Sequence, residues 1–188
     1  DIHCPEGCIA AAQTLAAQLY GSDRCFFAVN GTTQAIQAML MTAVKPGGKV
    51  LIPRNAHRSV AGGLLLGDLE PVYVLPQFDA VFGINTQVTA GQIEEALQKD
   101  PSIKAVFLTS PNYYGQAADI KTIAQIAHKY GAVVMIDAAQ SLAHFKVDIQ
   151  ELDVDFYAIS GHKTFAPTGV GAIYIKEKYL KNIKPYQT

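Results

Sequence analysis

Short apolar runs separated by helix-like segments are the feature of this sequence that most limits its fold. Seven runs have the length and composition of buried β-strands, and they lie at residues 26–30, 49–53, 70–75, 104–109, 133–137, 156–159 and 171–175. Most of them are separated by longer segments with helical periodicity. Repeated strand–helix units predict a parallel sheet with right-handed crossovers and helices on both faces.

The last strand departs from this pattern. Only a short loop separates the run at 156–159 from the run at 171–175, and a short loop leaves no room for a crossover helix. We therefore expect a seven-stranded, mostly parallel sheet with one antiparallel strand, in an α/β fold of three layers. A chain of 188 residues fits a single domain with a substantial core.

The amino-acid composition limits the kinds of molecule that we expect the chain to bind. With 49% hydrophobic and 16% charged residues, the chain is expected to be compact and globular. With a net charge of −1, the chain has no excess of positive charge that would attract nucleic acid. No apolar run approaches the roughly 20 residues of a membrane span, and no signal peptide opens the sequence, so we expect neither a nucleic-acid nor a membrane partner.

Cysteine usage predicts a reducing, cytoplasmic setting. The three cysteines Cys4, Cys8 and Cys25 are an odd number clustered at one end, which does not suit a disulfide framework. His3, Cys4 and Cys8 could be read as part of a metal site, but further ligands at recognisable spacings do not follow. We expect an ordinary N-terminal segment with reduced thiols and no metal.

An acid and an amine follow two of the predicted strands. The run at 133–137 ends in Asp137, and Lys163 lies just after the run at 156–159, in Ser160-Gly161-His162-Lys163. Ligands of open α/β sheets bind outside the carboxyl ends of the strands. A cofactor with an aldehyde and a basic ring nitrogen needs these two groups, an amine for a Schiff base and a carboxylate that keeps the ring protonated. The pair predicts pyridoxal 5'-phosphate.

Other residues have donors that suit the same cofactor. Gly31, Thr32 and Thr33 open a predicted helix, whose first backbone N–H groups could cradle a phosphate or simply form a turn and cap. Ser160 and His162 add donors beside Lys163. Gln140, three residues after Asp137, is expected to donate to the phenolic oxygen of the cofactor.

Two groups of fold type I enzymes resemble this sequence. The stretch Phe26-Phe27-Ala28-Val29-Asn30-Gly31-Thr32-Thr33 through Pro53-Arg54-Asn55-Ala56-His57-Arg58-Ser59, to about Tyr130, resembles the ornithine/lysine/arginine decarboxylases. Asp137-Ala138-Ala139-Gln140, Ser160-Gly161-His162-Lys163 and Ala166-Pro167-Thr168-Gly169-Val170-Gly171 look like the cysteine desulfurases. The change of likeness near 130–137 suggests a chimera or a reconstructed large domain.

The resemblance implies an aspartate-aminotransferase-like large domain over residues 1–188, without the C-terminal small domain that both groups carry. It also implies that His57 stacks on the cofactor ring, and it favours the phosphate role for Gly31, Thr32 and Thr33. Lys163, Asp137 and His57 are predicted to be catalytic. Fold type I sites usually lie at a dimer interface, so a homodimer is expected.

Three functions remain open at this point. The first is an amino-acid decarboxylase-like lyase acting on a small-molecule amino acid. The second is cysteine desulfurase-like chemistry, which is weakened because no cysteine follows Cys25. The third is a designed or ancestral cofactor-binding scaffold with little or no activity. Asn112 or Tyr113, after the run at 104–109, either line the pocket or form a turn with packing tyrosines.

Overall fold

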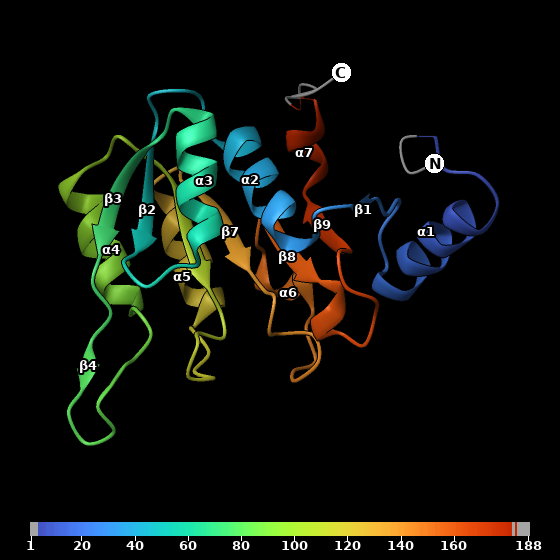
Figure 1. The fold of residues 1–188 in the computed structure, drawn as a ribbon. Helices are drawn as coiled ribbons and strands as arrows, with labels where there is room; N and C mark the ends of the chain where they lie inside the picture. The colour runs from blue at the N-terminus through green and yellow to red at the C-terminus, as the bar shows by residue number, and fades with distance from the viewer. Residues whose placement is uncertain (1–3, 182, 184–188) are drawn as a thin grey trace.

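The computed structural model describes residues 4–181 and 183 and is built on a seven-stranded sheet (Figure 1). Across the sheet the strands run in the order β1-β9-β8-β7-β6-β2-β3. Their bounds are β1 (Phe27–Ala28), β2 (Lys49–Pro53), β3 (Glu70–Val74), β6 (Ile103–Thr109), β7 (Val133–Asp137), β8 (Phe156–Ser160) and β9 (Gly171–Ile175).

Strand directions confirm the expected topology. The pairs β3–β2, β2–β6, β6–β7 and β7–β8 are parallel, whereas β9 is antiparallel to both of its neighbours, β8 and β1. From β2 the chain passes to β3 on one side and then returns to β6 on the other side. The gap between β2 and β6 is thus a switch point, and ligands of such sheets bind outside the strand ends there.

Helices cover both faces of the sheet, as expected. One face carries α2 (Gly31–Ala43) and α3 (Arg58–Gly67), and the other carries α4 (Ala90–Lys99), α5 (Ile120–Lys129) and the short α6 (Ile149–Leu152). Helix α1 (Gly7–Tyr20) lies apart from the sheet, and α7 (Glu177–Leu180) follows β9 (Figure 1). No helix among the residues that the structure describes is long and apolar enough to span a membrane.

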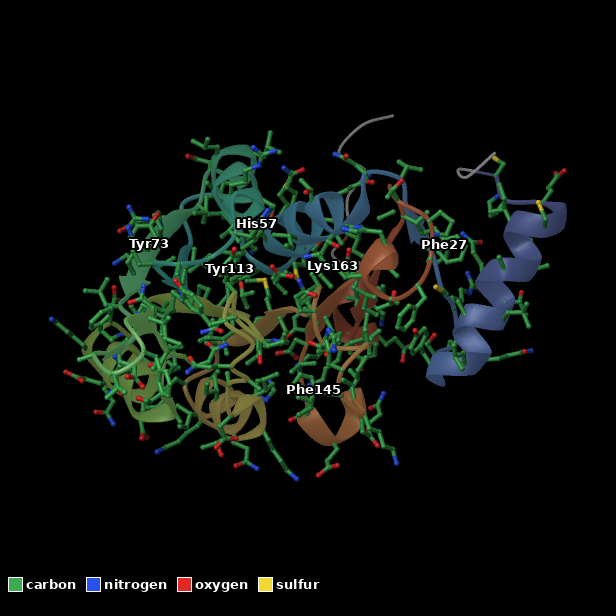
Figure 2. All side chains as sticks on the ribbon, turned by 60° about the horizontal axis from the view of Figure 1, so that its bottom comes forward. Phe27, His57, Tyr73, Tyr113, Phe145 and Lys163 are labelled. Carbon is green, nitrogen blue, oxygen red and sulfur yellow. The ribbon has the colours of Figure 1, made fainter. Side chains whose placement is uncertain are left out.

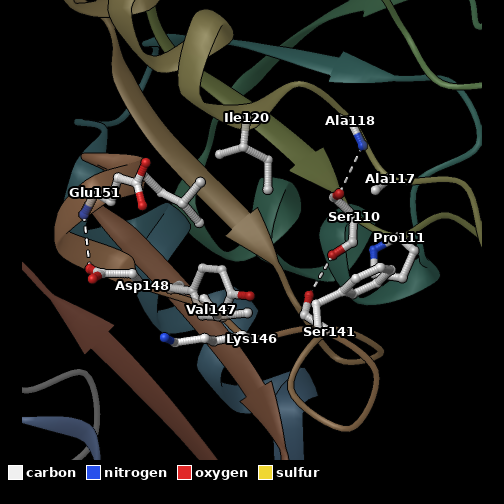
Figure 3. Close-up of a pocket in the computed structure, with 13 residues that line it drawn as sticks. Ser110, Pro111, Ala117, Ala118, Ile120, Ser141, Lys146, Val147, Asp148 and Glu151 are labelled. Carbon is white, nitrogen blue, oxygen red and sulfur yellow. Dashed lines mark hydrogen bonds between the residues drawn. The ribbon is translucent and has the colours of Figure 1, made fainter.

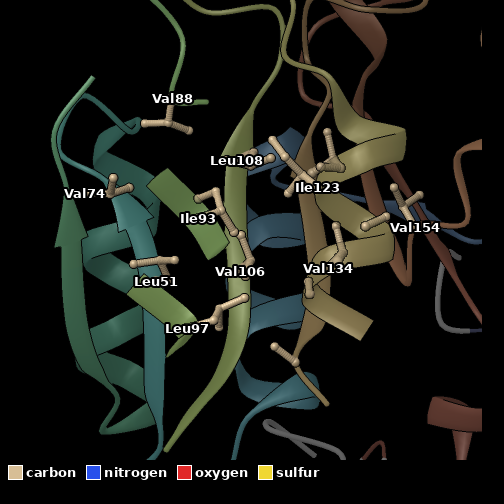
Figure 4. Close-up of a cluster of buried hydrophobic side chains, with 14 of the residues drawn as sticks. Leu51, Val74, Val88, Ile93, Leu97, Val106, Leu108, Ile123, Val134 and Val154 are labelled. Atoms are coloured by element: carbon tan, nitrogen blue, oxygen red, sulfur yellow. The ribbon is translucent and has the colours of Figure 1, made fainter. Parts of the chain in front are cut away.

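The two cores follow from the alternation of side chains along each strand. In β6, Val106 and Leu108 pack among the residues under α4 and α5, together with Ile93 and Ile123 (Figure 4). Ala105 and Phe107 of the same strand point the other way, into the cluster under α2 and α3. Because both faces are covered, the inner strands are almost continuously apolar, which is why they were recognisable as short runs.

Local residue chemistry sets two of the helix ends. Thr89 and Gln92 make a reciprocal capping box at the start of α4: the Thr89 hydroxyl accepts from the Gln92 N–H at 3.2 Å, and the Thr89 N–H donates to the Gln92 side chain at 2.9 Å. Gly21 ends α1 in the left-handed conformation, with φ of 62°. These local signals fix the helix boundaries without help from the core.

Two segments differ from the sequence prediction. The strand expected at 26–30 is reduced to Phe27–Ala28, because the chain turns into α2 at Gly31, which has φ of 59°. Between β3 and α4 the chain forms a small antiparallel hairpin of β4 (Phe78–Asp79) and β5 (Ile84–Asn85), which is not among the seven predicted strands. The Asp79 carboxylate accepts from two N–H groups of the connecting turn, and this local bond pattern closes the hairpin.

A network of charges ties β8, β9 and α5 together at the amino edge of the sheet. Asp155, just before β8, is fully buried and accepts hydrogen bonds from the Val134 N–H at 2.9 Å and from the His128 ring at 2.7 Å. Lys176 and Lys178 lie 3.3 and 3.1 Å from its other oxygen. Burial opposes ionisation of Asp155, but these donors and charges outweigh it, and the pKa of the carboxyl is lowered.

We expect Asp155→Asn to lower the free energy of unfolding by about 3 kcal/mol, because it removes the buried negative charge that His128, Lys176 and Lys178 surround. Urea unfolding at neutral pH measures this loss. As the matched control, Glu151→Gln removes an exposed ion pair with Lys121 and should cost about 1 kcal/mol or less.

The stability that Asp155 contributes should also depend on pH. Since the folded pKa of Asp155 is lowered, its contribution is present above the unfolded pKa and is lost as pH falls through the folded pKa. Equal losses in the two variants would contradict this account of the amino edge.

Candidate active site

Three polar side chains line up at the carboxyl edge of the sheet, on the face covered by α2 and α3. Thr109 ends β6 and pairs in register with Asp137 at the end of β7, while Ser160 ends β8. The residues two positions earlier in these strands, Phe107, Met135 and Ala158, belong to the core under α2 and α3. Side chains alternate along a strand, so Thr109, Asp137 and Ser160 point to that same face.

Asp137 is the buried acid of this edge, with only 4% of its surface exposed. One carboxylate oxygen accepts a hydrogen bond from the Ala139 N–H at 3.1 Å. Burial raises the pKa of Asp137, and the Ala139 bond, His57 and Lys163 oppose this rise only in part. Lys163 and His57 thus both lie near enough to influence the pKa of Asp137. The order of the strands predicted this for Lys163, whereas His57 was expected here from the resemblance alone.

His57 reaches the same edge from the start of α3. It is the N-cap of that helix, and its Nδ1 accepts a hydrogen bond from the Ser59 N–H at 3.2 Å. The ring itself is exposed. His57 and Lys163 lie on the carboxyl-edge face, which Figure 2 turns toward the reader.

Lys163 lies in a tight turn that directly follows β8. This turn, η1 (Gly161–Lys163), is held by the Thr164 hydroxyl, which donates to the carbonyls of Ser160 and Gly161 at 2.9 and 3.1 Å. The Lys163 side chain is exposed at the carboxyl edge. Ser160 Oγ and His162 Nδ1 lie 3.2 Å apart, so the two predicted donors form one unit beside the lysine.

The start of α2 is packed against residues that flank the turn with Lys163. Gly31 N–H donates to the Gly169 carbonyl at 3.1 Å, and the Thr32 hydroxyl donates to the Ile159 carbonyl at 3.3 Å. A Cβ on Gly171 would lie 2.5 Å from Gly31 backbone carbon, so only glycine lets β9 pass this closely. The N-cap Asn30 makes no side-chain cap bond, and Thr33 is half-buried in the first turn.

Gln140 is the predicted residue that the structure ties least firmly to the others. It follows Asp137 in the turn after β7, and its side chain is exposed. The hydrogen bonds of the described residues do not connect it with Asp137, His57 or Lys163. Its role therefore stays a prediction from its place in the sequence.

The loop after β6 contains Asn112 and Tyr113, for which a pocket role and a turn role were both open. Asn112 is buried, and its carboxamide oxygen accepts from the N–H groups of Tyr114 and Gln116 at 3.0 Å each. It is a turn-forming residue. Tyr113 is 94% exposed and lies on the carboxyl-edge face (Figure 2), with its ring edge-on to Tyr114.

Sequence reasoning missed Thr109. Its hydroxyl is buried and has no hydrogen-bond partner among the described residues, directly beside Asp137 in the sheet. A buried hydroxyl without a partner costs about 1–3 kcal/mol, and a role in binding or catalysis is one explanation for such a group. The only signal in the sequence was its position as the last residue of a strand.

A cavity of about 360 Å³ lies on the opposite face of the sheet, next to α5 and α6 (Figure 3). Its two serines are already paired, since the Ser141 hydroxyl donates to the Ser110 carbonyl at 2.7 Å and the Ser110 hydroxyl accepts from the Ala118 N–H at 3.0 Å. Asp137, His57 and Lys163 do not line it. The cavity is therefore separate from the candidate site.

The described part of the chain contains no group of three or more His, Cys, Asp or Glu side chains placed to hold a metal ion. Of the N-terminal residues considered for such a site, His3 lies outside the described residues. Cys8 is exposed.

Comparison with known families decides the lineage of this chain. The family model described as "Orn/Lys/Arg decarboxylase, major domain" matches residues 1–178. The chain belongs to this family. This decarboxylase-family match continues through 130–137, where the sequence likeness was expected to change, and extends to residue 178. The predicted likeness to the cysteine desulfurases is confirmed as well, over more of the chain than its C-terminal part.

Two relatives illustrate both likenesses of this decarboxylase-family chain. An arginine decarboxylase of Bacillus cereus is 34% identical over 193 residues, which cover 100% of the chain and 42% of the relative. The cysteine desulfurase CsdA of Escherichia coli is 30% identical over 188 residues, which cover 94% of the chain and 45% of the relative. The chain thus spans less than half the length of these two relatives.

Solved structures confirm the large-domain fold. A complex of SepCysS with the SepCysE N-terminal domain matches with a TM-score of 0.80 at 20% identity, over 100% of this chain and 51% of that one. The Escherichia coli desulfurase CsdA matches with 0.74 at 26% identity, over 95% and 45%. C-DES, in a variant with glycine covalently linked to its PLP cofactor, matches with 0.76 at 24% identity, over 94% and 48%.

Proposed function

We propose that this decarboxylase-family chain binds pyridoxal 5'-phosphate through Lys163 and acts as a lyase on amino acids, in the manner of a decarboxylase. The observation that carries the proposal is the buried Asp137, which lies at one sheet edge beside His57 and within electrostatic reach of the Lys163 amine. A buried carboxylate with a raised pKa is poorly stabilised by the protein alone. A cationic ring nitrogen placed against it would supply the missing counter-charge.

The residues present fit the parts of this cofactor. Lys163 would hold the aldehyde through its amine, Asp137 would face the ring nitrogen, and the exposed His57 ring would lie flat on the pyridine. The N–H groups at the start of α2, with Thr33 beside them, offer a phosphate site at a helix N-terminus. Further donors for the cofactor would come from the Thr32 N–H and from Ser160, His162 and Gln140, while Gly31, whose own N–H is bound to Gly169, would let the phosphate approach the backbone closely.

When bound, the cofactor supplies an electron sink for the carbanion formed at the substrate Cα. The residues of the chain would do the rest by position and charge. Asp137 would keep the ring nitrogen protonated, His57 would fix the ring plane, and the released Lys163 amine would donate or accept a proton at Cα. Tyr113, exposed on the same face, is placed to border a substrate.

Product analysis separates the decarboxylase reading from its alternative. The likeness to CsdA supports a second candidate, desulfurase-like lyase chemistry on cysteine. Incubation with pyridoxal phosphate and arginine, lysine or ornithine should release the corresponding amine and carbon dioxide. With cysteine and excess dithiothreitol, release of alanine together with sulfide, formed when the thiol reduces the sulfur removed from the substrate, would favour the desulfurase instead. Cofactor binding with neither set of products would mean a binding scaffold, and it would overturn the lyase assignment.

We also propose that two copies of the chain associate. Helix α1 contains no charged residue, and Leu15 and Leu19 are 66% and 76% exposed on it. An uncovered apolar helix of this kind favours association. Leu15→Gln with Leu19→Gln should therefore lower the sedimentation coefficient to that of a single chain at micromolar concentration, whereas the exposed control Lys104→Gln should leave it unchanged. A single-chain value for the unmodified protein would contradict the proposal.

A further inference from the structure

Ser59 directs two hydrogen-bond donors at one nitrogen of His57. Its backbone N–H lies 3.2 Å from His57 Nδ1, and its hydroxyl oxygen lies 2.8 Å from the same atom (Ser59 is buried, His57 exposed). A backbone N–H can only donate, so Nδ1 must present its lone pair to it. The Ser59 hydroxyl, facing the same lone pair, must then donate as well.

This arrangement selects one form of the imidazole. With Nδ1 used as an acceptor, the neutral ring carries its proton on Nε2. The two donors also hold the ring against rotation about its Cβ–Cγ bond, because rotation would carry Nδ1 away from both of them. Ser59 therefore fixes the tautomer and the plane of His57 together.

Helix capping alone does not require the second donor. At the start of α5, Asp119 caps by accepting the Thr122 N–H, and at α4 the Thr89 hydroxyl accepts the Gln92 N–H. In α3, the bond from the Ser59 N–H to His57 Nδ1 would by itself complete the same kind of cap. The additional bond from the Ser59 hydroxyl does nothing for the helix and acts only on the ring.

We propose that Ser59 is a positioning residue, which presents His57 as the Nε2–H tautomer in a fixed plane ready to stack on a planar, ring-shaped ligand. The inference rests on the proposed function, in which that ligand is pyridoxal phosphate. A ring that is ordered before binding loses less rotational freedom when the ligand arrives. The effect should therefore appear both in the unliganded ring and in the affinity for the cofactor.

The test compares the unmodified protein with Ser59→Ala, Ser59→Thr and a matched control. The control is Thr89→Ala, which removes a capping hydroxyl from α4 that bonds only with Gln92 of its own helix. Long-range ¹H–¹⁵N NMR on the cofactor-free protein reports the tautomer of His57. Absorbance titration with pyridoxal phosphate gives the dissociation constant of each variant.

We expect a single Nε2–H tautomer for His57 in the unmodified protein. In Ser59→Ala the Nδ1 resonance should move downfield as one hydrogen bond is lost, and the dissociation constant should rise about fivefold, the effect of a single hydrogen bond. Ser59→Thr should restore both, and Thr89→Ala should change neither.

An Nδ1–H tautomer in the unmodified protein would overturn the inference, and so would an unchanged Nδ1 resonance in Ser59→Ala. Equal losses of affinity in Ser59→Ala and Thr89→Ala would reduce Ser59 to a structural cap. If the unmodified protein binds no pyridoxal phosphate, the proposed function fails, while the NMR arm still decides whether Ser59 sets the state of the ring.

Discussion

Lys163→Ala should abolish the visible absorption band that appears when the unmodified protein is mixed with pyridoxal phosphate. The band depends on a covalent bond between an amine and the cofactor aldehyde, and Lys163 is the amine that follows β8 on the same edge as Asp137. Loss of this attachment should also lower any lyase rate by several orders of magnitude. A spectrophotometric titration measures the first effect directly.

The matched control for this variant is Lys104→Ala. Lys104 is exposed and lies near the start of β6, toward the opposite edge of the sheet. Its removal should leave both the absorption band and the titration midpoint unchanged. A band of undiminished strength in Lys163→Ala would mean that another lysine holds the cofactor.

Asp137→Asn should weaken binding of the cofactor while stabilising the cofactor-free protein. Removing one partner from a buried charge pair costs about 3 kcal/mol, which corresponds to a roughly 100-fold higher dissociation constant. In the cofactor-free protein the same carboxylate is buried with a single hydrogen bond from Ala139. Its neutral replacement should raise the free energy of unfolding by about 1–2 kcal/mol at neutral pH.

The contribution of Asp137 to the free energy of unfolding should change with pH in a definite direction. Burial raises the folded pKa of Asp137 above its unfolded value. Its contribution to stability is therefore greatest below the unfolded pKa and declines as pH rises toward the folded pKa. Asp137→Asn should remove this decline. In the control Asp119→Asn, where asparagine caps α5 as well as aspartate does, neither affinity nor stability should change. Stability lost rather than gained in Asp137→Asn would contradict the electrostatic account.

Much of the fold could be predicted from the sequence because its signals are local. The inner strands are short apolar runs buried on both faces, and the antiparallel direction of β9 followed from the short connection after Lys163. The hairpin of β4 and β5 could not be predicted in the same way. It has only two pairs of residues and depends on the bonds that the Asp79 side chain makes with its own turn.

In the candidate site, the residues that end strands could be predicted from the sequence. Residues whose roles depend on three-dimensional contacts could not. Asp137 and Lys163 could be connected because parallel strands place their carboxyl ends at one edge. His57 was found through its motif. The roles of Thr109, Ser59 and Gly171 depend on register, on a bond to a neighbouring ring and on the close approach of β9 to α2. None of these has a signature in composition or spacing.

The most direct test of the central claim is peptide mapping of the protein after incubation with pyridoxal phosphate and reduction with borohydride. Reduction makes the bond between the amine and the cofactor permanent, so mass spectrometry can locate it. We expect one pyridoxyl group per chain, on Lys163. Label spread over exposed lysines such as Lys104, or no label at all, would contradict it.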